Sequence, residues 1–477
     1  MISMIFLAMW TGIGMLIIAN QYKYITLFEQ ISLGFWYGLA IACIEMFLQN
    51  ILVGYFSSIP FIVTNLIITW ILIYKIIKNK SFAKEILHYR KADLLYIQQI
   101  YSKSSKRVKI LLVILGIYIM TKIVMMIQIN IHQPTIDEDA VLWRDMKTKI
   151  FFEHKSLVLD SKDPEFLGTA IWRTPFAPLI DNYFLLPYKE LPINLLNIFS
   201  SLVYISMIIG MFWIFVRKKN VATGIIAAYS IVSMPFVFIH WVGAYFNLAG
   251  GRTLFMVGFY LMDQIRKTQE SEQKNSNIIW ILLPIVFLAS TIRNENLLLC
   301  WLLIGRSRVY FLLFGPKKKI PFKKYWYIII GIILAGAATY YLNHLGNSQI
   351  WWDIGTLSQN ALGANQAIQA SPIQLISTFW QLYFHPEYNI LFLLFSIALI
   401  LAIAYIKLCK HIRNMLGITV VMFCIYLGIL ITNPHLGLLT HLGLIRYGIA
   451  LIPFIIYCTY SIFYEIYQHH KTDFITE

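Results

Sequence analysis

The sequence predicts an all-α, polytopic membrane protein, and its composition and its long apolar runs support this prediction. Of the 477 residues, 58% are hydrophobic, and the mean hydropathy is +0.66. Only 13% are charged, whereas a typical soluble domain carries about 25%. The apolar runs are about 17 to 24 residues long, close to the ~20 residues that cross a bilayer as a helix. These figures exclude an ordinary soluble protein, a coiled coil, collagen and a disordered chain.

The apolar runs predict about thirteen transmembrane helices in a single domain that covers residues 1–477. The pair 278–292 and 295–314 could instead form a helical hairpin that does not cross fully, because the polar residues Arg293, Asn294 and Glu295 lie between them. The predicted spans are 4–20, 31–54, 58–77, 110–130, 191–216, 220–241, 246–263, 278–292, 295–314, 326–342, 389–406, 415–432 and 444–465.

Basic residues predict the orientation of these spans. Lys and Arg number 39 against 23 Asp and Glu, a net charge of +16, and ten of the basic residues lie between positions 75 and 109. Cytoplasmic loops are enriched in Lys and Arg, so this explanation is preferred to nucleic-acid binding. With thirteen spans, the basic clusters all fall on the cytoplasmic side. We therefore expect a multi-pass protein of the cell membrane, with its N-terminus outside and its C-terminus in the cytoplasm.

Two long loops, 131–190 and 343–388, are expected on the outer face. The first carries ten of the 23 acidic residues, and its length is far above the usual 4 to 6 residues of a connection. Long loops of this kind more often carry function. Leu142, Met146, Ile150 and Phe151 recur at helical spacing, so residues 140–153 are predicted to form an amphipathic helix along the membrane surface.

Three consecutive acids, Asp137, Glu138 and Asp139, follow an apolar span directly. Clustered carboxylates can bind a hard divalent cation, and one of them can act as a general base for a hydroxyl group. They can also simply stabilise the positive end of the following helix. The pattern alone leaves these three interpretations open.

Two arginines lie in or beside apolar runs near the predicted outer face. They are Arg293, in the run STIRNENLLL, and Arg446, in the run THLGLIRYGIALIPF. Arginine binds phosphate through a planar fork of donors, and a charged group at membrane depth usually faces a cavity or a partner. The alternative is that both side chains extend to the lipid headgroups.

The outer loop also contains Trp172 and Arg173, next to Pro175 and Pro178. An aromatic platform suits a sugar ring, and it also suits the membrane interface, where tryptophan is enriched. No zinc-binding HExxH motif, nucleotide-binding glycine motif or GxSxG nucleophile motif is present. The sequence therefore gives no support to a nucleotide-dependent or serine-nucleophile enzyme.

Four short segments, in order along residues 110 to 455, resemble elements of the bacterial integral-membrane glycosyltransferases of the GT-C superfamily. This group includes lipid-linked-sugar-dependent protein mannosyltransferases and aminoarabinose transferases. Departures are Thr174 for the usual aromatic residue, Asn296 for glycine, and a Trp143 that lies one position nearer to Asp139 than expected. The matching residues are Asp139 with Lys147 and Lys149, then Pro175 and Pro178, then Arg293, Asn294 and Glu295, and finally Arg446 and Pro453.

The resemblance implies an enzyme that transfers a sugar from a polyprenyl-phosphate donor to a lipid or glycan acceptor at the outer face. The general base would be Asp139, favoured by its distance from Lys149, or Asp137. The donor phosphate would be bound by Arg293, Arg446, Lys149 and Lys147, and the substrate by Glu295, Arg173 and Trp172. A divalent cation, Mg or Mn, would be held by Asp137 and Glu138, and Asp145 is expected to be uninvolved.

Two other functions remain as alternatives. A polymerase or ligase of lipid-linked glycans shares the many spans and the large outer loop, but uses outer-face arginines in place of a carboxylate base. A transporter or lipid flippase would carry ionisable residues in mid-span, where the sequence shows only Glu45 clearly.

Overall fold

The structure, a computed structural model, consists of helices joined by turns in the residues that it describes. None of these residues lies in a β-strand, so the all-α class is confirmed for this part of the chain. The described residues are 2–21, 27–78, 84, 95, 98–99, 102, 105–133, 144–157, 176–216, 221–242, 251–253, 255–260, 278–292, 300, 390–405, 408–432 and 440–476.

Five helical stretches within the described residues are long and apolar enough to cross a membrane, which gives the chain the character of a helical membrane protein. They are α2 (Leu27–Val53), α3 (Ser58–Lys78), α5 (Lys106–His132), Asn197–Val216 in α9 (Ile193–Val216) and Gly448–His470 in α21 (Thr440–Thr476). Further helices are α1 (Ile2–Gln21), α13 (Ile278–Ile292), α18 (Leu391–Ala404), the 3-10 helix η6 (Leu408–His411) and α19 (Arg413–Thr432).

The structure does not confirm the predicted count of thirteen spans. The predicted span 220–241 is divided into α10 (Val221–Ser233) and α11 (Pro235–Val242). A proline has no N–H to continue the hydrogen-bond ladder, so α10 ends before Pro235. The predicted spans 295–314, apart from Cys300, and 326–342 lie outside the described residues, as does the outer loop 343–388.

Helices α1 and α2 approach each other closely and run antiparallel. The side chain of Gln30 donates to the backbone oxygen of Met15 over 2.6 Å. A Cβ atom added to Gly14 would collide with the backbone oxygen of Gly34, and one added to Gly38 would collide with that of Trp10. Small residues at such positions allow helix backbones to come together in a membrane.

Gly14→Ala is therefore expected to lower the melting temperature of the purified protein, because the added methyl group must push α1 away from the backbone of α2. Gly12→Ala is the matched control: it lies on the same helix, and an added Cβ meets no atom within 4 Å. Alanine is the better helix former by about 1 kcal/mol, so the control should melt at the same temperature or slightly higher. Equal melting temperatures for the two variants would contradict this packing.

The bundle interior contains ionisable residues that the sequence analysis did not place there. Arg252 is buried; its Nη2 lies 3.5 Å from Ser32 Oγ, and its Nη1 donates to Met211 Sδ over 3.6 Å. Glu29, also buried, accepts a 2.5 Å hydrogen bond from the hydroxyl of Tyr260. Glu29 lies in the first turn of α2, so its burial does not place it in mid-span, and the interpretation of Glu45 as the clear mid-span ionisable residue stays a prediction.

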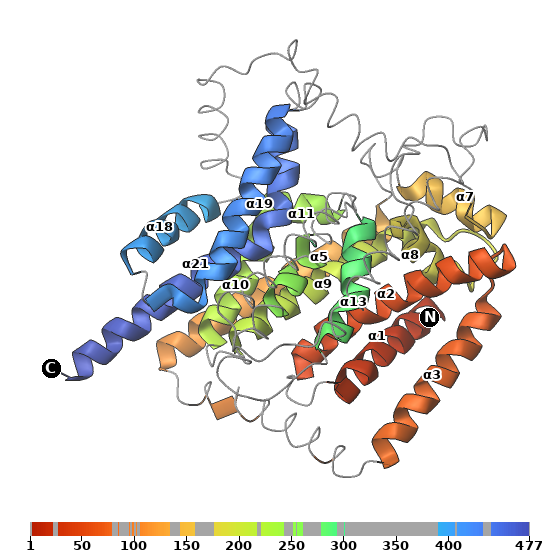
Figure 1. Ribbon diagram of the computed structural model, residues 1–477, viewed down its shortest axis with the longest axis horizontal. Coiled ribbons are helices and arrows are strands. Elements are labelled where there is room, and N and C mark those ends of the chain that lie inside the picture. The colour runs from red at the N-terminus through yellow and green to blue at the C-terminus, as the bar shows by residue number, and fades with distance from the viewer. Residues whose placement is uncertain are drawn as a thin grey trace, which may run out of the picture.

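Two helices of the loop 131–190, α7 (Met146–His154) and α8 (Phe176–Leu185), lie against one end of the bundle, on the right of Figure 1. Within the predicted helix 140–153 the structure has a helix at Met146–His154, with Phe151 buried against the bundle. Lys147 and Thr148 are buried as well, so the predicted amphipathic character and position along the membrane surface are not confirmed. Tyr183 of α8 packs on Trp10 of α1 and on Phe61 of α3.

The turn between α2 and α3 contacts the same loop. The backbone N–H of Phe56 donates to the oxygen of Lys155, and the N–H of Leu157 donates to Asn50 Oδ1 over 3.0 Å. The described part of the loop 131–190 therefore shares one end of the bundle with this turn.

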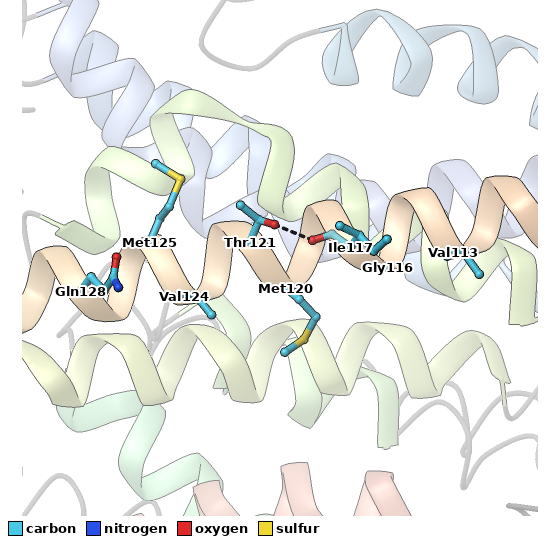
Figure 2. Close-up of a pocket in the computed structure, with 8 residues that line it drawn as sticks. All are labelled: Val113, Gly116, Ile117, Met120, Thr121, Val124, Met125 and Gln128. Atoms are coloured by element: carbon cyan, nitrogen blue, oxygen red, sulfur yellow. Dashed lines mark hydrogen bonds between the residues drawn. The ribbon is translucent and has the colours of Figure 1, made fainter.

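Helix α5 carries a groove of about 710 Å³ along its exposed side, shown in Figure 2. Ile117 and Met120, both more than half exposed, are among the residues that line it. An apolar surface of this kind on a membrane-spanning helix is suited to contact with lipid chains. The groove ends at Gln128, close in sequence to the polar residues that finish the helix. The lining residues are Val113, Gly116, Ile117, Met120, Thr121, Val124, Met125 and Gln128.

Candidate functional site

A buried arginine, Arg144, lies where α5, α7, α8 and α9 meet. Its Nε and Nη2 both approach Asp145 Oδ1 at 2.7 Å, and its Nε lies 3.4 Å from Asp181 Oδ2. The exposed fraction of the side chain is 4% for Arg144 and 1% for Asp181. A buried cation requires acceptors for its N–H groups, and two carboxylates supply them here.

Asn197, in the first turns of α9, binds both Arg144 and the end of α5. Its Oδ1 accepts a 2.8 Å hydrogen bond from Arg144 Nη2, and its Nδ2 donates to the backbone oxygen of Gln133 over 3.2 Å. Ser200, one helical turn further along α9, accepts a 3.3 Å hydrogen bond from Arg144 Nη1. The side chain of Asn197 is itself buried.

Residues 134–143, called the acidic segment below, lie between Gln133 and Arg144 in the sequence, and these two residues are its flanks. The segment includes the predicted base and cation ligands Asp137, Glu138 and Asp139, and it lies outside the described residues. Both flanks contact one asparagine side chain. The acidic segment therefore begins and ends at a single buried polar cluster.

Asp181, like Arg144 and Asn197, is a residue of this cluster that the sequence analysis missed as a site residue. It lies on α8 in the stretch FAPLIDNYFL, where an acid among apolar residues was the available signal. Its Oδ2 accepts from Thr148 Oγ1 over 3.4 Å, whereas its Oδ1 has no hydrogen-bond partner among the described residues. Burial raises the pKa of its carboxyl to about 7; the charge of Arg144 lowers the pKa and the charge of Asp145 raises it.

Asn182 joins α7 to α8. Its Nδ2 donates to the backbone oxygens of Thr148, over 3.1 Å, and of Pro178, over 2.9 Å. These bonds satisfy buried carbonyl groups that would otherwise be costly. They hold α7 and α8 together next to Arg144.

The two predicted phosphate-binding lysines of α7 do not share one side of the helix. Lys147 is 2% exposed. The side chain of Lys149 is 61% exposed, and its Nζ lies 3.8 Å from Glu153 Oε1. Residues two positions apart point to opposite sides of a helix, so the lysines cannot contact one phosphate from the same face of α7.

The remaining predicted site residues are not brought together by the described part of the structure. Arg173, Trp172, Arg293 and Glu295 lie outside the described residues, and only the backbone of Arg446 is described, within α21. Among the residues that the structure describes, no group of three His, Cys, Asp or Glu side chains could hold a metal ion.

Asp145 was expected to take no part in the site, but it contacts the buried arginine. It is the closest ionic partner of the buried Arg144, at 2.7 Å. Removal of one partner of a buried ion pair leaves an uncompensated charge. Asp145 therefore contributes to the site, and a substitution there is not a neutral control.

The pKa of Asp181 predicts a pH-dependent stability. The folded state holds the Asp181 proton up to about pH 7, whereas the unfolded state releases it near pH 4. Between these values the folded state binds more protons, so its stability falls as pH rises, by up to about 1.4 kcal/mol per pH unit. The amide of Asp181→Asn does not titrate.

Melting temperatures of wild type and Asp181→Asn in detergent, at pH 5, 6, 7 and 8, measure this effect. The melting temperature of the variant should rise relative to that of wild type as pH rises from 5 to 7, and this difference should not grow further above the folded-state pKa. Glu153→Gln removes an acid from the exposed side of α7 and should run parallel to wild type. A parallel curve for Asp181→Asn would show that its carboxyl does not hold a proton at neutral pH.

Comparison with known proteins gives no family for this chain. No protein-family model, no curated protein and no solved structure matches it. A proposal for the function of this chain therefore rests on the geometry of the cluster around Arg144 and on the sequence motifs.

Proposed function

We propose that this protein transfers a sugar from a polyprenyl-phosphate-linked donor to a lipid or glycan acceptor on the outer face of the cell membrane. The activity comes from the resemblance to GT-C glycosyltransferases. The observation that carries it is the buried cluster of Arg144, Asp181 and Asn197, which holds both flanks of the acidic segment at the end of a helical membrane bundle. A segment held in this way is suited to present a carboxylate to a substrate.

In this proposal Asp139 is the general base, with Asp137 as the alternative. The carboxylate takes the proton of the acceptor hydroxyl while the hydroxyl oxygen bonds to the anomeric carbon. The bond from that carbon to the phosphate oxygen breaks, the configuration inverts, and the polyprenyl phosphate leaves with the electron pair.

Positive groups stabilise the negative charge on the leaving phosphate. Arg293 and Arg446 are the proposed forks, with Lys149 as a further cation on the exposed side of α7; the buried Lys147 does not share that side. Glu295, Arg173 and Trp172 are the proposed contacts to the sugar and the acceptor, and Asp137 and Glu138 are the proposed ligands of a Mg or Mn ion. The transfer described above does not pass through this ion.

The proposal includes the GT-C-like arrangement of about thirteen spans, with the N-terminus outside and the C-terminus in the cytoplasm. It requires residues 131–190 outside and residues 78–108 inside. Single-cysteine variants Ser161→Cys and Ser104→Cys test this with a membrane-impermeant thiol reagent on intact cells. Ser161→Cys should be labelled and Ser104→Cys should not, in each case relative to the labelling of the wild-type protein. Labelling of Ser104→Cys alone would reverse the orientation and remove the mechanism with it.

Asp139→Asn is expected to lower sugar transfer by roughly 10² or more, the scale of general-base catalysis. The change keeps the shape of the side chain and removes its basicity. The assay is transfer from a defined polyprenyl-phosphate sugar by purified protein, with donor binding measured in parallel and expected to stay normal. Glu153→Gln, on the exposed side of α7, replaces Asp145 as the control.

The comparison with Asp137→Asn identifies the base. A loss confined to Asp137→Asn would move the base two residues upstream. Full activity in both variants would refute carboxylate catalysis and favour the polymerase or ligase, which relies on arginines.

A transporter or flippase is the second candidate, and the burial of Glu29 and Arg252 inside the bundle favours it. Ionisable residues in such places commonly line a pathway. Uptake or flipping of a labelled lipid-linked sugar by protein in vesicles, without transfer to an acceptor, would establish this function in place of transfer.

A further inference from the structure

We propose that Glu45 of α2 is a proton-binding site within the membrane part of the protein, with its carboxyl protonated at neutral pH. Asn65 of α3 and Tyr183 of α8 form the polar surroundings of this carboxyl. The site shares no residue with the cluster around Arg144. It goes beyond the proposed function, because no step of the sugar transfer uses it.

Glu45 lies inside a helix that is long and apolar enough to span a membrane. It is eight residues before the end of α2 at Val53, which is about 12 Å along the helix axis. Its Oε1 is buried and has no hydrogen-bond partner among the described residues. A carboxylate at this depth lacks the bulk water that would stabilise its charge.

The amide of Asn65, a residue that is 0% exposed, meets the carboxyl of Glu45. Its Nδ2 donates to the backbone oxygen of Phe61 over 2.7 Å, and it lies 3.3 Å from the hydroxyl of Tyr183. The distance from this nitrogen to Glu45 Oε2 is 3.4 Å. Three acceptors therefore compete for two N–H groups, and the bond to Glu45 is the longest. The hydroxyl of Thr64 also lies near the carboxyl, but it is as neutral as the amide.

No described cation pairs with Glu45. The ion pairs among the described residues do not include it, and α1, α8, α9 and α13, which pack against α2, contain no Lys, Arg or His. Helix α3 carries Lys75 and Lys78 only in its last turn, and Lys155 of the loop lies over the ring of Phe152. The remaining titratable groups of these helices are all acids: Glu29, Tyr37 and Cys43 of α2, Tyr74 of α3, Asp181 and Tyr183 of α8, and Tyr204 of α9.

The groups around the carboxyl fit a proton and do not fit a metal ion. The three atoms around Asn65 Nδ2 are all oxygens, which fixes the amide with its donor side toward Glu45 and leaves its Oδ1 without a partner among the described residues. A hard metal ion needs several converging oxygens, and an N–H group in that place repels it. A proton needs one oxygen, and Glu45 Oε1 is available. A neutral O–H without an acceptor costs far less than an unpaired buried charge.

Infrared spectroscopy of the full-length protein in lipid vesicles tests the inference, because a protonated carboxyl has a carbonyl stretching band that an ionised carboxylate lacks. Glu45→Gln keeps the shape of the side chain and removes the carboxyl. The spectrum of wild type minus that of the variant, at pH 7, should contain the band of a protonated carboxyl. A carboxylate band in its place would overturn the inference.

Glu153→Gln is the matched control for this spectrum. The side chain of Glu153 is 52% exposed and lies near Lys149, so its carboxyl is expected to be ionised. The difference spectrum for this variant should show a carboxylate band and no band of a protonated carboxyl. The same substitution thus gives opposite results at a buried and at an exposed position.

Dicyclohexylcarbodiimide, an apolar reagent that modifies protonated carboxyls, covers the case in which Glu45→Gln does not fold. The carboxyl proton moves to a nitrogen of the reagent, the carboxyl oxygen bonds to its central carbon, and the adduct rearranges to a stable acylurea from which nothing leaves. Mass spectrometry of peptides from treated wild-type protein should find Glu45 modified and Glu153 unmodified. Modification should fall by roughly tenfold or more from pH 6 to pH 9, as the protonated fraction falls. An unmodified Glu45 at every pH would contradict the proposal.

The same two measurements in sodium chloride and in choline chloride separate a proton from a metal cation. A proton site gives the same infrared band and the same modification of Glu45 in both salts. Loss of the band, or protection from the reagent, in sodium chloride alone would mean that Na⁺ occupies the site, and the proton would be rejected as its ligand.

Discussion

The arrangement of the outer-loop helices depends on the burial of one guanidinium. Arg144 lies at the end of a membrane bundle with 3% of its surface exposed, so it loses most of its contact with water. Such a charge is tolerated only where acceptors surround it. These acceptors come from α8, from α9 and from its own neighbour Asp145, and the end of α5 joins them through Asn197. One desolvated charge thus joins four segments that are far apart in the sequence.

The need to compensate buried charges also explains the raised pKa of the Asp181 carboxyl. Asp145 lies closer to the guanidinium than Asp181 does, at 2.7 Å against 3.4 Å, and is the more exposed of the two carboxylates. One cation close to two carboxylates cannot compensate both in a buried site. The more deeply buried carboxylate bears the larger cost of ionisation, which raises its pKa. The site therefore combines a satisfied cation with an acid that is near its titration point at neutral pH.

Hydropathy and periodicity predicted the helical class, the positions of most described helices and a helix at Met146–His154, although not the burial of Lys147 and Thr148 in it. These features depend on local composition, which a sequence displays directly. The number of spans was not confirmed, since Pro235 divides one predicted span and others lie outside the described residues. The roles of Asn197, Arg144 and Asp181 could not be predicted, because their partners, apart from the neighbouring pair Arg144 and Asp145, lie from 33 to 64 positions away. An asparagine at the start of an apolar helix gives no sign of such partners.

The chemistry of the cluster also limits which part of a substrate it can meet. Each nitrogen of the Arg144 guanidinium already has an acceptor among the described residues. A phosphate group would have to displace them. Asp181 Oδ1 has no hydrogen-bond partner among the described residues. It can donate to a water or a hydroxyl when the carboxyl holds its proton, and when the carboxyl is ionised it accepts from them and repels a phosphate. The cluster is therefore not a phosphate site, and in the proposed reaction the phosphate of the donor is bound by Arg293 and Arg446 instead.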